Sequence, residues 1–250
     1  MNRLTMALAA ALFLLLMPVA YAQPVAIDAI FSQTPERKPS SSGGIGIPSE
    51  DGNTTQMDIN GTQITQHWQG YYGNISGEIT LDDADSNTLF SWRLASVSGE
   101  IFAVNTTASV QWGNITCVNL TNATGTLDDM NGATKINGST LNQQYFIAQE
   151  DEDDITGTFN YSFGGSITIG AVAIDSTDAC PTAYLNVNNQ SQTTDYVELL
   201  LFDNASALVF GTIIEPDTTV GFDSKEWNFQ MIVPQENASV GTYYFYVELS

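Results

Sequence analysis

Short runs in which apolar and polar residues alternate dominate the chain from about residue 58 onward. Between residues 75 and 81, for example, Ile75, Gly77, Ile79 and Leu81 would share one face of an extended segment. This period of two is typical of β-strands with one buried face, and stretches rich in Asp, Asn, Gly and Pro separate the runs. We therefore predict an all-β fold, an antiparallel two-sheet sandwich that is jelly-roll-like or immunoglobulin-like.

Two of the runs are near copies of each other, ISGEITL at 75–81 and VSGEIFAV at 97–104. The first follows the Gly-rich, aromatic stretch HWQGYYGN, and we interpret the pair of segments as a turn leading into a half-buried strand. A third run, ITIGAVAI at 167–174, is apolar at nearly every position and is predicted to be a strand buried on both sides.

The first residues of the chain predict export. A single Arg precedes an uncharged apolar run, Met6–Val19, which ends in the small-x-small sequence Ala20-Tyr21-Ala22. We expect residues 1–22 to be a signal peptide that is removed. No later apolar run reaches about 18 residues, so we expect no membrane span in the mature chain and a secreted, extracellular or cell-surface location.

Two further segments follow the predicted signal peptide. Residues 23–57 are expected to be an N-terminal arm and a linker rich in Pro, Ser and Gly, and residues 58–250 the β-sandwich domain. The apolar segment Val25–Phe31 has two possible roles: it is the first strand of its own domain, or it completes the sheet of a neighbouring copy.

The charge of the chain excludes one class of partner. Beyond the predicted signal peptide there are 5 Lys and Arg against 28 Asp and Glu, a net charge of −23. Such a field repels phosphate backbones, so we expect no binding to nucleic acid.

The chain contains two cysteines, Cys117 and Cys180. In an oxidising compartment, two cysteines without C-x-x-C spacing are most simply one structural disulfide. A metal-binding pair and a free nucleophile are the alternatives, and each would require further ligands or a nearby base.

N-x-S/T sequences are unusually frequent, since 12 of the 18 Asn residues after position 22 begin one. The Ser and Thr content predicts about four by chance, so we expect dense N-glycosylation rather than a bias of composition alone. The predicted acceptors are Asn53, Asn60, Asn74, Asn105, Asn114, Asn119, Asn122, Asn137, Asn160, Asn189, Asn204 and Asn237.

Catalytic constellations are hard to assemble from this sequence. His67 is the single histidine, and no G-x-S-x-G sequence accompanies it. We interpret His67 as a strand or turn residue and expect no enzyme.

Two acidic stretches lie between predicted strands, at 82–85 and 150–154. Oxygen-rich loops suit calcium, and for the second stretch we predict Asp151, Asp153 and Asp154 as its ligands. The alternative is a solvated turn without a cofactor, because Asp favours turns in any case.

Aromatic residues close to His67 could bind a sugar by stacking. Trp68, Tyr71 and Tyr72 are the predicted ligand-binding residues, with burial in the core as the alternative. The other tryptophans fall in or beside alternating runs and are predicted to be core residues: Trp92, Trp112 and Trp227.

Four segments together resemble a group of uncharacterised exported archaeal β-proteins: WQGYYGNISGEITL, SWRLASVSGEIFA, VQWGNITCVN and FQMIVPQENASVGTYYFYVEL. The first of them contains the pattern W-x-G-x-x-G-N-I-[ST]-G-x-I-x-L. The resemblance covers most of residues 67–250 and implies an archaeal source and export, without implying a mechanism.

From these observations we expect a secreted, N-glycosylated structural protein of the cell surface or extracellular space, such as a filament or surface-layer-associated subunit. Its partners would be copies of itself or other surface proteins. The alternative is an adhesin-like module that binds carbohydrates or cell surfaces.

Overall fold

The structure is a computed structural model. It describes residues 23–27, 51, 54, 56–58, 63–94, 96–106, 109–121, 124–127, 134–148, 151–188, 190–235 and 242–250. The predicted signal peptide, most of the predicted linker and five of the predicted glycosylation sites lie outside the described residues.

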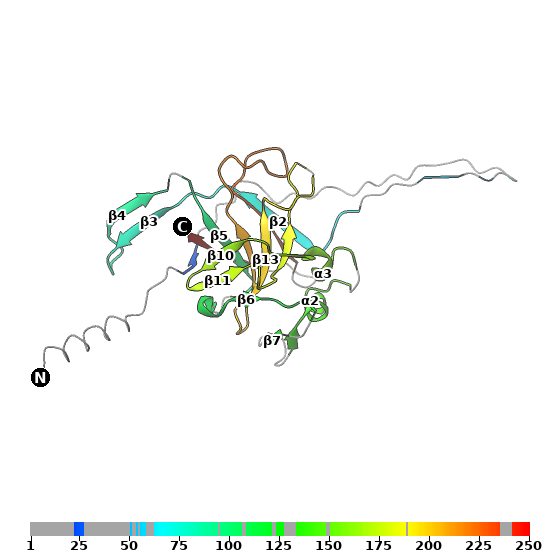
Figure 1. Ribbon diagram of the computed structural model, residues 1–250, viewed down its shortest axis with the longest axis horizontal. Coiled ribbons are helices and arrows are strands. Elements are labelled where there is room, and N and C mark those ends of the chain that lie inside the picture. The colour runs from blue at the N-terminus through cyan, green and yellow to red at the C-terminus, as the bar shows by residue number, and fades with distance from the viewer. Residues whose placement is uncertain are drawn as a thin grey trace, which may run out of the picture.

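One large antiparallel sheet organises the fold (Figure 1). Its strands follow the order β1-β16-β5-β14-β13-β12-β9, and β6 also pairs with β13. Their bounds are Val25–Ala26 (β1), Gly99–Val104 (β5), Thr116–Cys117 (β6), Tyr161–Ser162 (β9), Pro181–Tyr184 (β12), Val197–Phe202 (β13), Leu208–Ile213 (β14) and Tyr244–Leu249 (β16). The predicted all-β, antiparallel, sandwich-like fold class is confirmed.

The two faces of this sheet are both buried. Along β13, Leu200 and Phe202 enter one apolar cluster, whereas Leu199 and Leu201 enter a second. Successive side chains of a strand point to opposite faces, so the two clusters lie on opposite sides of the sheet. The neighbouring strands β5 and β14 divide their side chains between the clusters in the same way.

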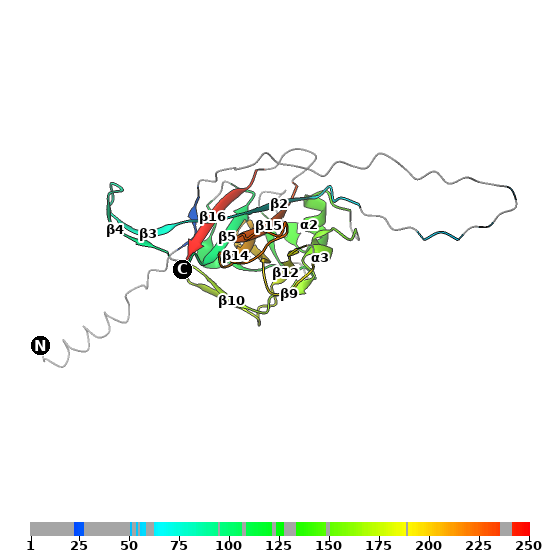
Figure 2. The ribbon, with the colours of Figure 1, turned by 90° about the horizontal axis from the view of Figure 1, so that it is seen from above.

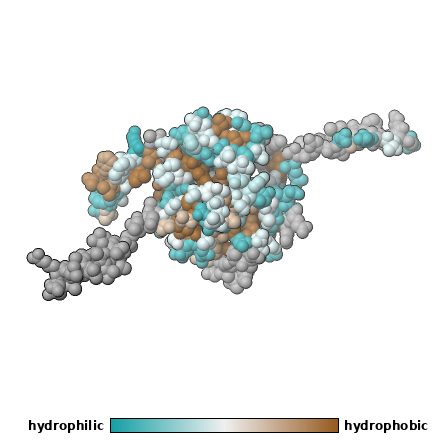
Figure 3. Space-filling model, in the orientation of Figure 1, coloured by the Kyte–Doolittle hydropathy of each residue, from teal (hydrophilic) through white to brown (hydrophobic). Residues whose placement is uncertain are grey.

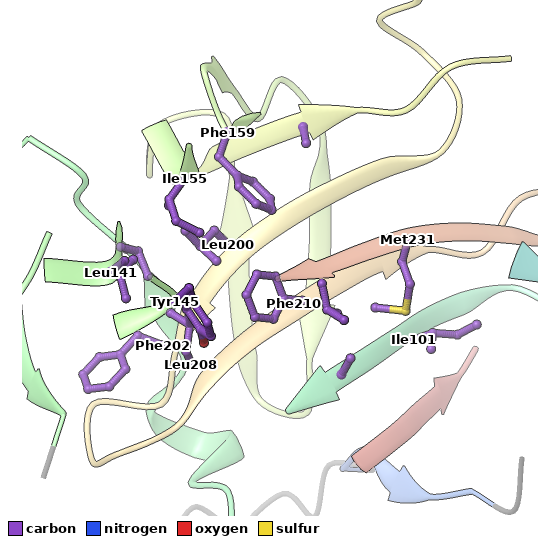
Figure 4. Packing of buried hydrophobic residues seen from close by; sticks show 14 of the residues in the cluster. Ile101, Leu141, Tyr145, Ile155, Phe159, Leu200, Phe202, Leu208, Phe210 and Met231 are labelled. Atoms are coloured by element: carbon purple, nitrogen blue, oxygen red, sulfur yellow. The ribbon is translucent and has the colours of Figure 1, made fainter. Parts of the chain in front are cut away.

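A two-stranded ribbon and two short helices cover the first face. The ribbon consists of β2 (Trp68–Gly73) and β15 (Phe229–Pro234), and the helices are α2 (Gly138–Gln144) and α3 (Ile155–Thr158). Figure 4 shows Met231 of the ribbon, Leu141 and Ile155 of the helices and Phe210 of β14 in this cluster. Both helices have polar N-caps, Asn137 and Asp154, although the chain shows no sustained helical period.

A hairpin and a short 3₁₀ helix cover the second face. The hairpin is formed by β10 (Ser166–Ile169) and β11 (Val172–Asp175), and η1 spans Trp112–Asn114. Figure 2 shows β10 on the side of the sheet opposite β2. The prediction of one strand at 167–174 is wrong, because the chain turns at Gly170, whose φ of 56° suits glycine. Trp112 is 7% exposed, as predicted for a core residue.

Two further ribbons complete the structure. One consists of β3 (Glu78–Asp82) and β4 (Thr88–Arg93), and the other of β7 (Thr124–Leu127) and β8 (Thr134–Ile136).

Among the described residues, no helix has the length and apolar character needed to cross a membrane.

The predicted disulfide is confirmed. Cys117 in β6 is bonded to Cys180, which precedes β12, and their Cα atoms lie 4.8 Å apart. The bond closes a loop with a sequence separation of 63 residues that contains α2 and α3. In the chain-entropy account, such a loop stabilises the fold by about 4 kcal/mol.

The N-terminal strand β1 pairs with the large sheet of its own chain. Val25 pairs with Val247 and Ala26 with Tyr246, so β1 forms an edge of the large sheet. Ile27 packs against the first apolar cluster. Of the two roles predicted for Val25–Phe31, the structure shows the first for Val25–Ala26. Residues 28–31 lie outside the described residues.

Acidic side chains interrupt the otherwise apolar sheet. Glu100 of β5 is only 9% exposed, and burial, together with Glu248 on the adjacent strand, raises its pKa from the ordinary 4.5 to about 7. Glu198 of β13 is fully buried, and burial raises its pKa well above the usual range. The backbone N–H of Ile232 donates to the Glu198 carboxyl at 2.8 Å, which ties β15 to the sheet.

These glutamates predict a fold that loses stability as the pH rises. Between pH 4.5 and about 7 the folded chain holds a proton on Glu100 that the unfolded chain has released. The free energy of unfolding should therefore fall through this interval, by about 3 kcal/mol for Glu100 alone. Glu100→Gln should remove that part of the difference between pH 5 and pH 8 in denaturant titrations.

Glu78 provides the matched control, because it occupies the same position in the near copy of this strand and is exposed. Glu78→Gln should leave the pH dependence at its wild-type size. A Glu100→Gln variant with the full wild-type pH dependence would contradict the prediction.

Candidate functional site

The most unusual surface of the molecule is the β3–β4 ribbon with its flanking residues, Ser76–Arg93. We call this ribbon the arm; it is distinct from the N-terminal arm predicted within residues 23–57. The arm stands off the body of the protein (Figures 1 and 2), and every residue in it is exposed. Its base is attached through Ile75 and Leu94, both half-buried against the first apolar cluster. The strand predicted at 75–81 is present as β3, but the prediction that it is half-buried is wrong.

One face of the arm is apolar. Ile79 pairs with Trp92 and Leu81 with Phe90 across the two strands. Directly paired side chains project to the same face, as do residues two apart in one strand. These four side chains are 42–55% exposed, and the rings of Phe90 and Trp92 meet edge to face at 4.9 Å. Figure 3 shows hydrophobic residues gathered on the arm. The prediction of Trp92 as a core residue is therefore wrong.

The two ends of the arm differ in charge. At its base Glu78 pairs with Arg93, and the turn at its tip contains Asp83 and Asp85. The side chain and backbone N–H of Asn87 donate to Asp83, which lowers the pKa of that carboxyl. The tip is consequently a fixed, anionic turn.

The predicted ligand-binding aromatics do not act together. Trp68 and Tyr71 pack against the first apolar cluster, Trp68 beside Phe159 and Tyr71 edge to face with Phe245 at 5.1 Å. Burial raises the pKa of Tyr71. The indole N–H of Trp68 donates to the backbone oxygen of Asp153 at 2.7 Å. Trp68 and Tyr71 thus serve the core and the loop beside it.

Tyr72 belongs to a different aromatic group. Its ring meets Phe222 at 4.7 Å and Trp227 at 5.0 Å, both edge to face. Tyr72 and Phe222 are 38% and 39% exposed, whereas Trp227 is half-buried and donates from its indole N–H to Asp223 at 2.7 Å. Sequence spacing did not indicate this group, because Tyr72 lies about 150 residues before Phe222 and Trp227.

The predicted calcium ligands are also divided. Asp154 is 5% exposed and caps α3: one carboxyl oxygen accepts from the N–H of Gly157 at 2.5 Å and the other from the Asn142 side chain at 2.8 Å. Asp is among the preferred N-cap residues, which is a local signal that could have indicated this role. Asp154 is therefore committed to the helix.

Asp151 and Asp153 instead lie beside the only histidine of the chain. One potential ligand atom from each of His67, Asp151 and Asp153 lies within 4.8 Å of the others. His67 and Asp153 are half-buried, and Asp151 is exposed. The sequence interpretation of His67 as a strand or turn residue missed this group, because 84 residues separate His67 from Asp151.

Seven of the predicted glycosylation sites lie among the described residues, and their side chains are exposed or half-buried. Exposed are Asn74, Asn114, Asn119, Asn160 and Asn204, and half-buried are Asn105 and Asn137. Five of the seven side chains are therefore at the surface, as a glycan acceptor must be. The remaining sites lie outside the described residues: Asn53, Asn60, Asn122, Asn189 and Asn237.

Comparison with known proteins finds no matching family model, no similar curated protein and no similar solved structure. The resemblance to exported archaeal β-proteins therefore stays a prediction.

Proposed function

We propose that this chain is an exported structural protein of the cell surface or extracellular space that works by contact, and that the arm binds the arm of a second copy. The observation that carries the proposal is the exposed apolar face of Ile79, Leu81, Phe90 and Trp92 on a ribbon that stands off the body.

An isolated two-stranded ribbon is only marginally stable in water, so a cover over its apolar face would stabilise it. Its four half-exposed apolar side chains offer about 400 Å² per copy, an area characteristic of interaction sites. Two such faces in contact, with their polar rims, would approach the ~1,200 Å² at which specific interfaces begin.

Charge limits which partner can cover the apolar face. The chain carries a net charge of −22, which disfavours anionic membranes and nucleic acid as the cover. The apolar face itself carries no charge, so two copies can meet there. A parallel arrangement would bring the acidic tips of the two arms, with Asp83 and Asp85, together, so the antiparallel arrangement is favoured.

The proposed compartment has independent support. A structural disulfide is typical of oxidising environments. Five of the seven described N-x-S/T sites are exposed, and residues 1–22 have the pattern of a signal peptide. An archaeal source would agree with the resemblance, and intact-mass measurement with and without deglycosylation tests the glycan load.

A carbohydrate-binding module is the second candidate function, favoured by the exposed Tyr72 and Phe222 rings beside Trp227. The interplanar angles of 68° and 65° between Tyr72 and its neighbours give no flat platform for a sugar ring. We therefore place this function behind self-association. A glycan array with the wild type and Tyr72→Ala tests it, since binding that depends on Tyr72 would support a sugar site.

The arm predicts a specific loss of association. The double variant Phe90→Thr, Trp92→Thr should convert the wild-type oligomer to a monomer in sedimentation experiments, because it removes both rings of the apolar face. Thr suits exposed strands, so the thermal midpoint of the body should change little.

Phe146→Asn is the matched control. Phe146 is 64% exposed on the body, and its φ of 55° is one that Asn tolerates. This variant should keep the wild-type oligomer. A wild type that stays monomeric at its highest soluble concentration would contradict the proposed self-association.

Glycosylation should be uneven among the described sites. The Asn204 side-chain nitrogen donates both of its hydrogens, to the Asn114 backbone oxygen at 2.7 Å and to the Thr116 hydroxyl at 3.0 Å. A glycan replaces one of these hydrogens, so the folded chain must lose a hydrogen bond. We expect lower occupancy at Asn204 than at the exposed Asn74 and Asn160, measured by glycopeptide mass spectrometry. Full occupancy at Asn204 with an unchanged thermal midpoint would contradict this.

A further inference from the structure

We propose that His67, Asp151 and Asp153 bind a divalent transition-metal cation of the zinc class. Two segments distant in the sequence bring one imidazole and two carboxylates together, with a potential ligand atom from each within 4.8 Å of the others. This site is independent of the arm and of the proposed self-association.

The kind of ligand selects the kind of ion. Calcium takes six to eight oxygen ligands and seldom an imidazole, whereas zinc binds His nitrogen and Asp oxygen at about 2.0–2.2 Å. With Asp154 committed to capping α3, two carboxylates and one imidazole remain. A set of one nitrogen and two oxygens suits zinc and its neighbours in the first transition row.

The surrounding contacts orient Asp153 and fix the backbone of His67. The Thr65 hydroxyl donates to one carboxyl oxygen of Asp153, so the second oxygen can bind the ion. The Trp68 indole fixes the backbone of Asp153, and the N–H of Gln235 donates to the backbone oxygen of His67 at 2.6 Å. Oriented carboxylates of this kind are typical of metal sites, where outer partners set the direction of the ligands.

The remaining adjustment is small. Ligand atoms in tetrahedral coordination lie about 3.3 Å apart when each is about 2.0–2.1 Å from the metal. Side-chain movements of about 1 Å, compatible with the exposed position of Asp151, would bring the three atoms to that spacing. Three protein ligands leave a coordination position for water or for a ligand from solution.

Binding of the cation would link two parts of the fold. His67 lies at the start of β2, and the aspartates lie in the loop that leads into α3. An ion bound only by the folded chain raises its stability with concentration. The thermal midpoint should therefore rise when Zn²⁺ is added to chelator-treated protein.

The experiment is NMR of the full mature chain during a Zn²⁺ titration. Because the chain has one histidine, its imidazole resonances report on His67 without any substitution. We expect these resonances to shift and saturate at one equivalent of Zn²⁺. An unshifted imidazole would overturn the proposal whatever the behaviour of the variants.

Variants separate the ligands from the charge of the loop. His67→Gln, Asp151→Asn and Asp153→Asn should each abolish the Zn²⁺-dependent rise in thermal midpoint. Thr65→Val should weaken Zn²⁺ binding by about 10-fold to 100-fold as a positioning residue, with an unchanged midpoint of the metal-free protein.

Glu152→Gln is the matched control, because Glu152 is an exposed acid between the two aspartates and is not part of the group. It should keep an affinity close to that of the wild type. Equal Zn²⁺ affinity in the wild type and His67→Gln, or displacement of Zn²⁺ by equimolar Ca²⁺, would assign the cation to oxygen ligands alone and overturn the proposal.

Discussion

The burial of β5, β14 and β13 on both faces is the constraint on which the rest of this structure depends. Strands without a solvent face have to satisfy every polar group inside the protein. Thr212 of β14 does so by donating to the backbone oxygen of Gln230 at 2.9 Å. Glu198 does so only in part: one carboxyl oxygen accepts from Ile232 at 2.8 Å, and the other has no hydrogen-bond partner among the described residues. Both bonds reach β15, so the few polar side chains of the sheet are what holds the covering ribbon in register.

The ribbon in turn places both candidate sites. At one end of β2, His67 meets the loop that Trp68 fixes through Asp153. Beyond the other end, the N–H of Ile75 donates to the Asn228 side chain at 3.1 Å, and the arm leaves the body. One strand thus separates a candidate cation site from a candidate contact surface, so either can be altered while the sheet beneath stays intact.

The near copies ISGEITL and VSGEIFAV show how far the sequence could predict this fold. The alternation in both is real, and both form strands, β3 and β5. Glu78 is nevertheless exposed on the arm, whereas Glu100 is 9% exposed with a pKa of about 7. Alternation specifies which side chains share a face but not what covers that face, because the cover comes from residues far away in the sequence. The same limit explains the wrong prediction for Trp92.

For the same reason, only part of the candidate metal centre could be predicted from the sequence. Acids between strands indicated a cation, and the loop 151–154 does supply two of the three proposed ligands. Capping chemistry is local, so the preference of Asp for the N-cap could have assigned Asp154 to α3. The pairing with His67 is not local: it requires β2 to pack on the large sheet, and that packing depends on buried groups of β13, β14 and β15. An imidazole brought to two carboxylates by tertiary packing therefore changes the expected ion from calcium to a zinc-class metal, which residue spacing alone could not do.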